Sequence, residues 1–238
     1  MSIAENIGRI RERMASAAGA AGRDPSEILL VGASKMNDAA ACRAAIAAGI
    51  DALGENRVQE MTAKLAENAY DGAPLHFIGH LQRNKVRQVV GKVSLIQSVG
   101  SLELLEEIRR QAEKRGLVQD VLLEVNIGGE ESKSGITPQE VPELVKKCQE
   151  LGHVRLRGLM AIPPAAAEPG ENRKFFAEMY QLYVDIRENL ADNRTAIDCL
   201  SMGMSGDFED AIAEGATLVR VGTALFGPRP PLHTGGTV

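Results

Sequence analysis

Lys35 and two small-residue turns near the C-terminus are the parts of this chain best suited to chemistry. Lys35 follows an apolar run, and a lysine amine that is partly desolvated there is nucleophilic and can form a Schiff base with an aldehyde. The first turn reads Met-Gly-Met-Ser-Gly-Asp over 202–207, and the second reads Arg-Val-Gly-Thr over 220–223. Backbone N–H groups in such turns can approach a phosphate closely. Together they suit a ligand that carries both an aldehyde and a phosphate.

The predicted phosphate-binding residues are Ser205, Gly206, Gly222 and Thr223. Ser205 precedes a predicted helix, so it is either an N-cap or part of an anion site. Gly222 and Thr223 follow the last apolar run, a frequent phosphate position in barrels. By strand alternation, Arg220 lies on the same face of the strand as Gly222. Arg220 is either a surface ion-pair partner or a fixed cation near the ligand. Pyridoxal 5'-phosphate (PLP) is the cofactor that this set of groups predicts.

Eight short apolar runs alternate with longer amphipathic segments. The runs cover 28–33, 50–53, 75–78, 93–97, 121–125, 154–160, 197–202 and 217–221. The helix-like segments cover 39–48, 58–69, 83–90, 102–115, 141–151, 174–190 and 207–214. This alternation is typical of parallel strands, and eight units predict a single (β/α)8 barrel over residues 1–229. A flavodoxin-like or Rossmann sheet is the alternative, but no G-x-G-x-x-G motif follows the first run.

The two ends of the chain differ in character. The N-terminal segment has Ile3, Ile7, Ile10 and Met14 at helical spacing with acidic residues between them. It therefore predicts a helix that caps the barrel, and it has no signal-peptide core. Residues 230–238 are expected to be a disordered tail.

Composition predicts a cytoplasmic protein without nucleic-acid or membrane partners. The chain has 27 basic and 32 acidic side chains, a net charge of -5, and no apolar stretch near the roughly 20 residues that span a bilayer. Cys42, Cys148 and Cys199 are too far apart for CxxC chemistry and are expected to be reduced thiols. No metal site is expected.

Polar residues follow nearly every apolar run, and in a barrel these strand ends meet at one mouth. Asn56 and Asn126 are either ligand contacts or partners of turn amides. His80 is either a general acid or a partner of the backbone. Of these three, Asn56 is assigned to the cofactor site with Lys35.

Seven motifs in this order resemble the YggS/PROSC family of pyridoxal phosphate homeostasis proteins, over residues from about 5 to 229. They are SK, GENRVQE, HFIGHLQRNK, EVNIGGEESKSG, RGLMAIP, LSMGMSGDFEDAI and RVGTALFG. The chain departs from the family pattern at Met36, Gly100 and Gly128.

The resemblance implies the barrel of the alanine racemase N-terminal domain and a role in vitamin B6 homeostasis. It implies that Lys35 holds PLP as an internal aldimine, that the two turns bind its phosphate, and that Arg220 faces the pyridine nitrogen. An arginine there leaves the ring a weaker electron sink than an aspartate does. The resemblance also implies a monomer, with PLP-dependent client enzymes as partners.

A non-catalytic PLP carrier and an amino-acid racemase remain as alternative functions. Racemisation requires acid/base groups on both faces of the substrate carbanion. Lys35 can serve one face, and the chain ends soon after the eighth run without a second domain to serve the other. We therefore expect a carrier without strong catalytic activity. A Schiff-base aldolase acting on a sugar phosphate explains Arg220 and the paired turns less well.

Overall fold

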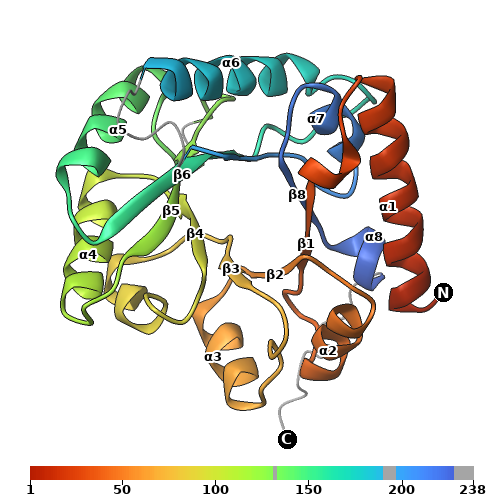
Figure 1. Ribbon diagram of the computed structural model, residues 1–238, viewed down its shortest axis with the longest axis horizontal. Coiled ribbons are helices and arrows are strands. Elements are labelled where there is room, and N and C mark those ends of the chain that lie inside the picture. The colour runs from red at the N-terminus through yellow and green to blue at the C-terminus, as the bar shows by residue number, and fades with distance from the viewer. Residues whose placement is uncertain (131–132, 190–196, 228–238) are drawn as a thin grey trace, which may run out of the picture.

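Eight parallel strands close into a barrel in the computed structural model, which describes residues 1–130, 133–189 and 197–227 (Figure 1). Each strand pairs with the next in sequence, and the last pairs with the first. The strands are β1 (Leu29–Ala33), β2 (Ala52–Glu55), β3 (Leu75–Phe77), β4 (Leu95–Val99), β5 (Gln119–Val125), β6 (Val154–Ala161), β7 (Cys199–Ser201) and β8 (Leu218–Val221). The predicted (β/α)8 barrel is confirmed. The predicted tail, 230–238, lies outside the described residues.

Helices surround the barrel on its outside (Figure 1). The α-helices are α1 (Ile3–Ala20), α2 (Ala39–Ala47), α3 (Val58–Ala66), α4 (Leu102–Glu113), α5 (Val141–Glu150), α6 (Arg173–Asn189), α7 (Phe208–Ala213) and α8 (Thr223–Phe226). The short 3-10 helices are η1 (Pro25–Glu27), η2 (Arg83–Gln88) and η3 (Pro138–Glu140).

Two helical segments differ from the prediction. Within the predicted helix 83–90, residues Arg83–Gln88 form the 3-10 helix η2 in place of an α-helix, and Val89 is its C-cap. The buried Val86 and Val89 are three residues apart, the spacing at which side chains lie above one another in a 3-10 helix. In the 58–69 segment, α3 ends at Ala66 because Asn68 adopts a left-handed backbone with φ 54°.

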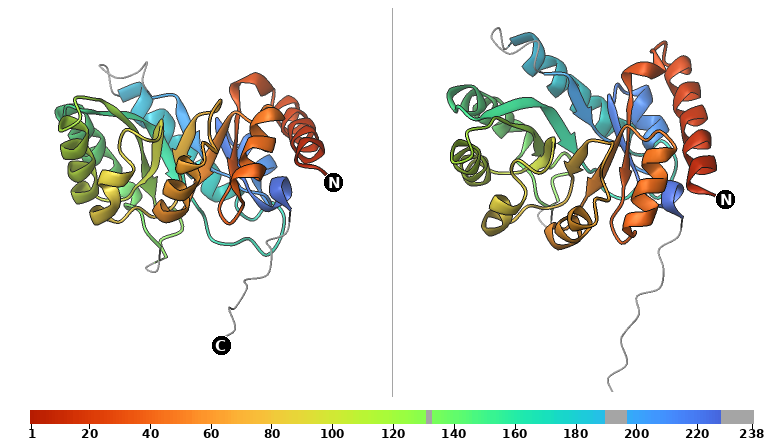
Figure 2. Two further views of the ribbon diagram at one scale, coloured as in Figure 1. Left: turned by 90° about the horizontal axis from the view of Figure 1, so that it is seen from below. Right: turned by 60° about the horizontal axis from the view of Figure 1, so that its bottom comes forward.

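The N-terminal helix α1 packs on the outer wall of the barrel, beside α7 and α8, and not over an end (Figures 1 and 2). The prediction of a capping position was therefore wrong. The reason is that α8 has only four residues, so it cannot cover the outside of β8 and β1 by itself. Ile7, Ile10 and Met14 of α1 are buried there. Ser2 and Glu5 form a capping box that fixes the start of the helix.

The barrel interior is filled by alternate strand residues. Two small apolar clusters lie apart from the main core, one of Val31, Ala52 and Leu218, and one of Leu95, Leu122 and Met160. Their strand neighbours, such as Leu30, Leu53 and Leu123, belong to the core beneath the helices.

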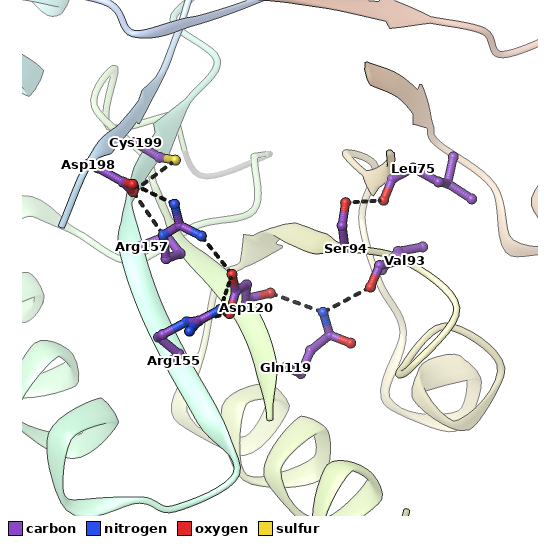
Figure 3. Close-up of polar contacts among 9 residues, drawn as sticks. All are labelled: Leu75, Val93, Ser94, Gln119, Asp120, Arg155, Arg157, Asp198 and Cys199. Atoms are coloured by element: carbon purple, nitrogen blue, oxygen red, sulfur yellow. Dashed lines mark hydrogen bonds and ion pairs between the residues drawn. The ribbon is translucent and has the colours of Figure 1, made fainter. Parts of the chain in front are cut away.

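Charged residues form a network at the amino ends of β5, β6 and β7 (Figure 3). Asp120 accepts hydrogen bonds from Arg155 Nε and Arg157 NH1, both at 2.7 Å. Arg157 Nε also donates to Asp198 at 2.8 Å. This end of the barrel lies opposite the loops that follow the strands. In (β/α)8 barrels, the catalytic residues are usually found at the end that carries those loops. We therefore regard this network as structural.

Candidate functional site

A pocket of about 300 Å³ opens at the carboxyl ends of β1 and β8. It brings together six of the seven residues assigned to the cofactor from sequence, namely Lys35, Ser205, Gly206, Arg220, Gly222 and Thr223. The remaining lining comes from Ala33, Met36, Asn37, Met204, Phe226 and Gly227. Residues separated by almost 190 positions in the chain thus line one concave site.

A tight turn after β1 sets the direction of Lys35. The next residue, Met36, has a left-handed backbone with φ 62°, which is unfavourable for a residue other than glycine. Two hydrogen bonds stabilise the turn. Met36 N donates to Glu60 Oε2 at 2.8 Å, and Asn37 N donates to Ser34 O at 3.1 Å.

A buried polar cluster of Ser34, Glu55, Lys64 and Tyr70 lies beneath this turn. Glu55 Oε1 accepts hydrogen bonds from Ser34 Oγ at 2.6 Å, Lys64 Nζ at 2.6 Å and Tyr70 OH at 3.0 Å. Lys64 Nζ also donates to Ser34 O at 2.8 Å. Burial, with the nearby Glu55 carboxylate, raises the pKa of Tyr70, so this hydroxyl stays protonated and donates. The cluster therefore fixes the end of β1, and none of its four residues lines the pocket.

The two phosphate-binding candidate turns are tied to each other through Ser205. Its Oγ accepts hydrogen bonds from Gly222 N at 3.2 Å and from Ala224 N at 3.4 Å. None of the described residues accepts a hydrogen bond from the backbone N–H of Gly206 or of Thr223. The turns therefore present backbone donors and a hydroxyl to the pocket, which is the donor set that a phosphate requires.

Arg220 is buried, with 4% of its surface exposed, although it lines the pocket. Its NH2 donates to Ala161 O at 2.9 Å, and its NH1 donates to Ser201 Oγ. Burial lowers the pKa of Arg220 to about 10, so the guanidinium is still charged at neutral pH. The alternative of a surface ion pair is therefore wrong, and Arg220 is a fixed cation at the pocket.

A chain of hydrogen bonds across the barrel interior holds Arg220. Ser201 Oγ donates to Gln97 Oε1 at 2.7 Å, and Gln97 Nε2 lies 2.9 Å from His76 Nδ1. Burial lowers the pKa of His76 to about 4, so the ring is neutral and Nδ1 can accept from the Gln97 amide. Four strands thus contribute to the position of one guanidinium.

Asn56, the seventh predicted residue, lines a different depression, together with His80. Its Oδ1 is buried and has no partner among the described residues. Asn126 instead closes its own turn, since its Nδ2 donates to Glu130 O at 2.8 Å. The turn-amide alternative therefore applies to Asn126, and His80 does not line the pocket of Lys35.

Sequence reasoning missed Glu124, which is 7% exposed and lies near the carboxyl end of β5. Ser134 Oγ donates to its Oε1 at 3.1 Å, and its Oε2 has no partner among the described residues. Burial raises its pKa. Ser201 and Gln97 were also missed. The sequence feature that could have identified these residues is a polar residue inside an apolar run, at one of the alternate positions that face the barrel interior.

Neither a metal centre nor a membrane span occurs in the part of the chain that the structure describes. No group of three His, Cys, Asp or Glu residues is placed there to hold a metal ion. No helix in these ranges is both long and apolar enough to cross a bilayer.

Comparisons with known proteins identify the family of this chain. The family model of the alanine racemase N-terminal domain matches residues 2–230. A pyridoxal phosphate homeostasis protein of Pseudomonas aeruginosa is 44% identical over 228 residues, which are 96% of this chain and 96% of that protein. That of Aquifex aeolicus is 43% identical over 229 residues, 96% of this chain and 99% of that protein. The structure of PipY from Synechococcus elongatus PCC7942, with PLP bound, has a TM-score of 0.76 and 35% identity, and covers 94% of this chain and 100% of PipY.

Proposed function

The chain belongs to the YggS/PROSC family of pyridoxal phosphate homeostasis proteins, and from this premise we propose that it binds PLP and acts in vitamin B6 homeostasis. One observation carries the proposal. Lys35, the buried Arg220 cation and the backbone donors of two turns line a single pocket. These groups match the aldehyde, the ring nitrogen and the phosphate of PLP in chemical type.

Each residue has a separate role in this proposal. When bound, PLP supplies an aldehyde and an electron-withdrawing ring. Lys35 would hold the aldehyde carbon through its amine, with the aldehyde oxygen leaving as water, and Ser205, Gly206, Gly222 and Thr223 would hold the phosphate. Arg220 remains protonated and faces the pyridine nitrogen, so that this nitrogen accepts a hydrogen bond and stays unprotonated. The Ser201 hydroxyl holds the guanidinium in that orientation.

Thr223→Glu is expected to weaken PLP retention. The new carboxylate would lie beside the phosphate, and two like charges about 4 Å apart repel by about 4 kcal/mol at an effective dielectric constant of about 20. We expect the affinity to fall at least ~10-fold, or ~1.4 kcal/mol, in an equilibrium titration followed by visible absorbance. Thr223→Val, which keeps the shape and adds no charge, should lose less. Equal retention in Thr223→Glu and wild type would exclude these turns as the phosphate site.

We also propose that the protein is a carrier and not an efficient racemase. Among the described lining residues, Lys35 and Arg220 are the only ones with ionisable side chains. An arginine is a poor proton donor because it is always charged in proteins. This set supports acid/base chemistry on one face of a substrate, whereas racemisation needs it on both.

The corresponding prediction concerns proton exchange. In deuterium oxide, the PLP-loaded protein should exchange the α-proton of alanine far more slowly than roughly 1 per second, the lower end of typical enzyme turnover. Proton NMR of alanine measures this rate directly, with buffer containing free PLP as the blank. Exchange at about 1 per second or faster would establish the racemase alternative.

We further propose that PLP-dependent enzymes receive the cofactor from this protein in the cytoplasm, and that the protein acts as a monomer.

A further inference from the structure

The loop between β6 and α6, residues 162–172, contacts the segment that carries Ser205 and Gly206. The helices α6 and α7 are neighbours on the outside of the barrel (Figure 1). Gly170 N of the loop donates to Asp210 Oδ2 of α7 at 3.1 Å. A cavity of about 190 Å³ lies between the loop and α7, and Gly206 lines both this cavity and the proposed PLP pocket. A change in the loop can therefore reach the pocket through one residue.

Asp207 closes the turn that contains Ser205 and Gly206. Its backbone N donates to Met204 O at 3.2 Å, and its Oδ1 accepts from Met204 N at 2.7 Å. Asp207 is also the N-cap of α7, but its side chain makes no capping bond to that helix. Both polar backbone groups of Met204 are thus bound to Asp207. The two residues between them are held in one orientation as a result.

The second carboxylate oxygen of Asp207 is held by Asn172, the last residue of the loop. Asn172 Nδ2 donates to Asp207 Oδ2 at 2.9 Å, and Asn172 is only 3% exposed. Asn172 is itself anchored at the start of α6, because its O accepts from Phe175 N at 3.0 Å and from Phe176 N at 3.1 Å. A buried amide on a fixed backbone therefore sets the direction of the Asp207 side chain.

Charge by itself makes Asp207 an unfavourable neighbour of a phosphate. Its carboxylate follows Gly206 directly in the chain and has the same sign as a phosphate bound there, so the two repel. Burial lowers the pKa of Arg220, and the carboxylates of Glu124 and Asp207 oppose this effect, so the charge of Asp207 acts on the pocket. Any contribution of Asp207 to phosphate binding therefore comes from the position that it gives the turn, and not from its charge.

We propose that Asn172 is a positioning residue for the phosphate of PLP. Through Asp207 it orients Ser205 and Gly206, and it thereby sets how strongly the site prefers PLP over pyridoxal, which has the same ring and aldehyde but no phosphate. Asn172 does not line the proposed PLP pocket, so its effect on the ligand passes through the turn. The inference rests on the proposed function, because it takes this turn as part of the phosphate site.

Asn172→Ala tests this role in equilibrium titrations with PLP and with pyridoxal, followed by visible absorbance. The dissociation constant for PLP should rise at least ~10-fold, the usual effect of losing one hydrogen bond to a charged group. That for pyridoxal should equal the wild-type value, and this binding also shows that the variant is folded. Asn189→Ala, at the exposed far end of α6, is the matched control and should keep the wild-type preference for PLP.

Two substitutions of Asp207 separate its position from its charge. Asp207→Ala removes both side-chain bonds and should weaken PLP binding at least ~10-fold, with pyridoxal binding unchanged. Asp207→Asn keeps an acceptor for Met204 N, and the Asn172 amide can rotate to pair with the new amide. It should therefore restore the preference for PLP to at least the wild-type level. A loss in Asp207→Asn as large as in Asp207→Ala would overturn the positioning role.

The preference of the wild type for PLP over pyridoxal distinguishes the two ways of failing. If the wild type prefers PLP and Asn172→Ala prefers it equally, the role of Asn172 is overturned while the proposed phosphate site stands. If the wild type binds PLP no more tightly than pyridoxal, the phosphate site itself is overturned, and the role of Asn172 with it.

Discussion

The Lys35→Ala protein is expected to form no borohydride-stable adduct with PLP. Lys35 lines the same pocket as Arg220 and the two turns proposed to bind the phosphate, and among the described lining residues only its amine can form a Schiff base. We therefore expect covalent labelling and the associated yellow colour to fall to background. Because Lys35 is only half-buried and faces the pocket, the free energy of unfolding should change by about 1 kcal/mol or less.

Peptide mapping by mass spectrometry after borohydride reduction measures this effect. In the wild type, the pyridoxyl group should be found on the peptide that contains Lys35 and on no other lysine. Lys92→Ala removes an exposed lysine outside the pocket and should label like the wild type. Some non-covalent binding through the turns is compatible with the prediction, so the modified peptide is the decisive readout. An adduct on Lys85, Lys92 or Lys133 with Lys35 unmodified would contradict the assignment.

Lys64→Met is expected to destabilise the protein by about 3–5 kcal/mol, the usual effect of removing one partner of a buried ion pair. The side chains of Lys64 and Glu55 are only 8% and 0% exposed, and Nζ lies 2.6 Å from Oε1. Methionine fills a similar volume but leaves the Glu55 carboxylate buried without its cation. It also removes the hydrogen bond to Ser34 O, next to Lys35. PLP affinity should therefore fall as well.

Denaturant unfolding without cofactor measures this loss. Lys146→Met, on the exposed face of α5, is the matched control and should stay within about 0.5 kcal/mol of the wild type. Adding Glu55→Gln to Lys64→Met removes the uncompensated charge, so the double variant should recover part of the loss. A single variant as stable as the control would show that the Lys64–Glu55 pair does not support the end of β1.

The order of strands and helices could be predicted from sequence because it is encoded locally. Aliphatic runs such as 121–125, bounded by polar turns, form β5 as expected. Ser101 precedes α4 and accepts a hydrogen bond from Leu104 N at 3.2 Å, as an N-cap does. Local spacing did not distinguish the 3-10 helix η2 from an α-helix. In a segment this short, a spacing of three residues between buried valines fits a 3-10 helix and an α-helix equally well.

The cluster of Lys35 with the two turns was also predictable, since each follows a strand and parallel strands of a barrel end at one mouth. Topology by itself brings such residues together, whatever their distance in the chain. It did not show which neighbouring strands share a pocket. Asn56 follows β2 and Lys35 follows β1, yet they line separate concavities.

Burial and pairing inside the barrel were decided only by the tertiary structure. Arg220 in sequence is an ordinary basic residue in an apolar run, and closure of the barrel places it beside Ser201, which itself bonds to Gln97. Ser201 and Gln97 are 104 residues apart, and no periodicity within a single strand specifies such a contact. Sequence by itself therefore determined which residues reach the mouth, through strand order and alternation. Tertiary packing determined which of them are desolvated and held in place, because burial and hydrogen bonding depend on neighbours from distant strands.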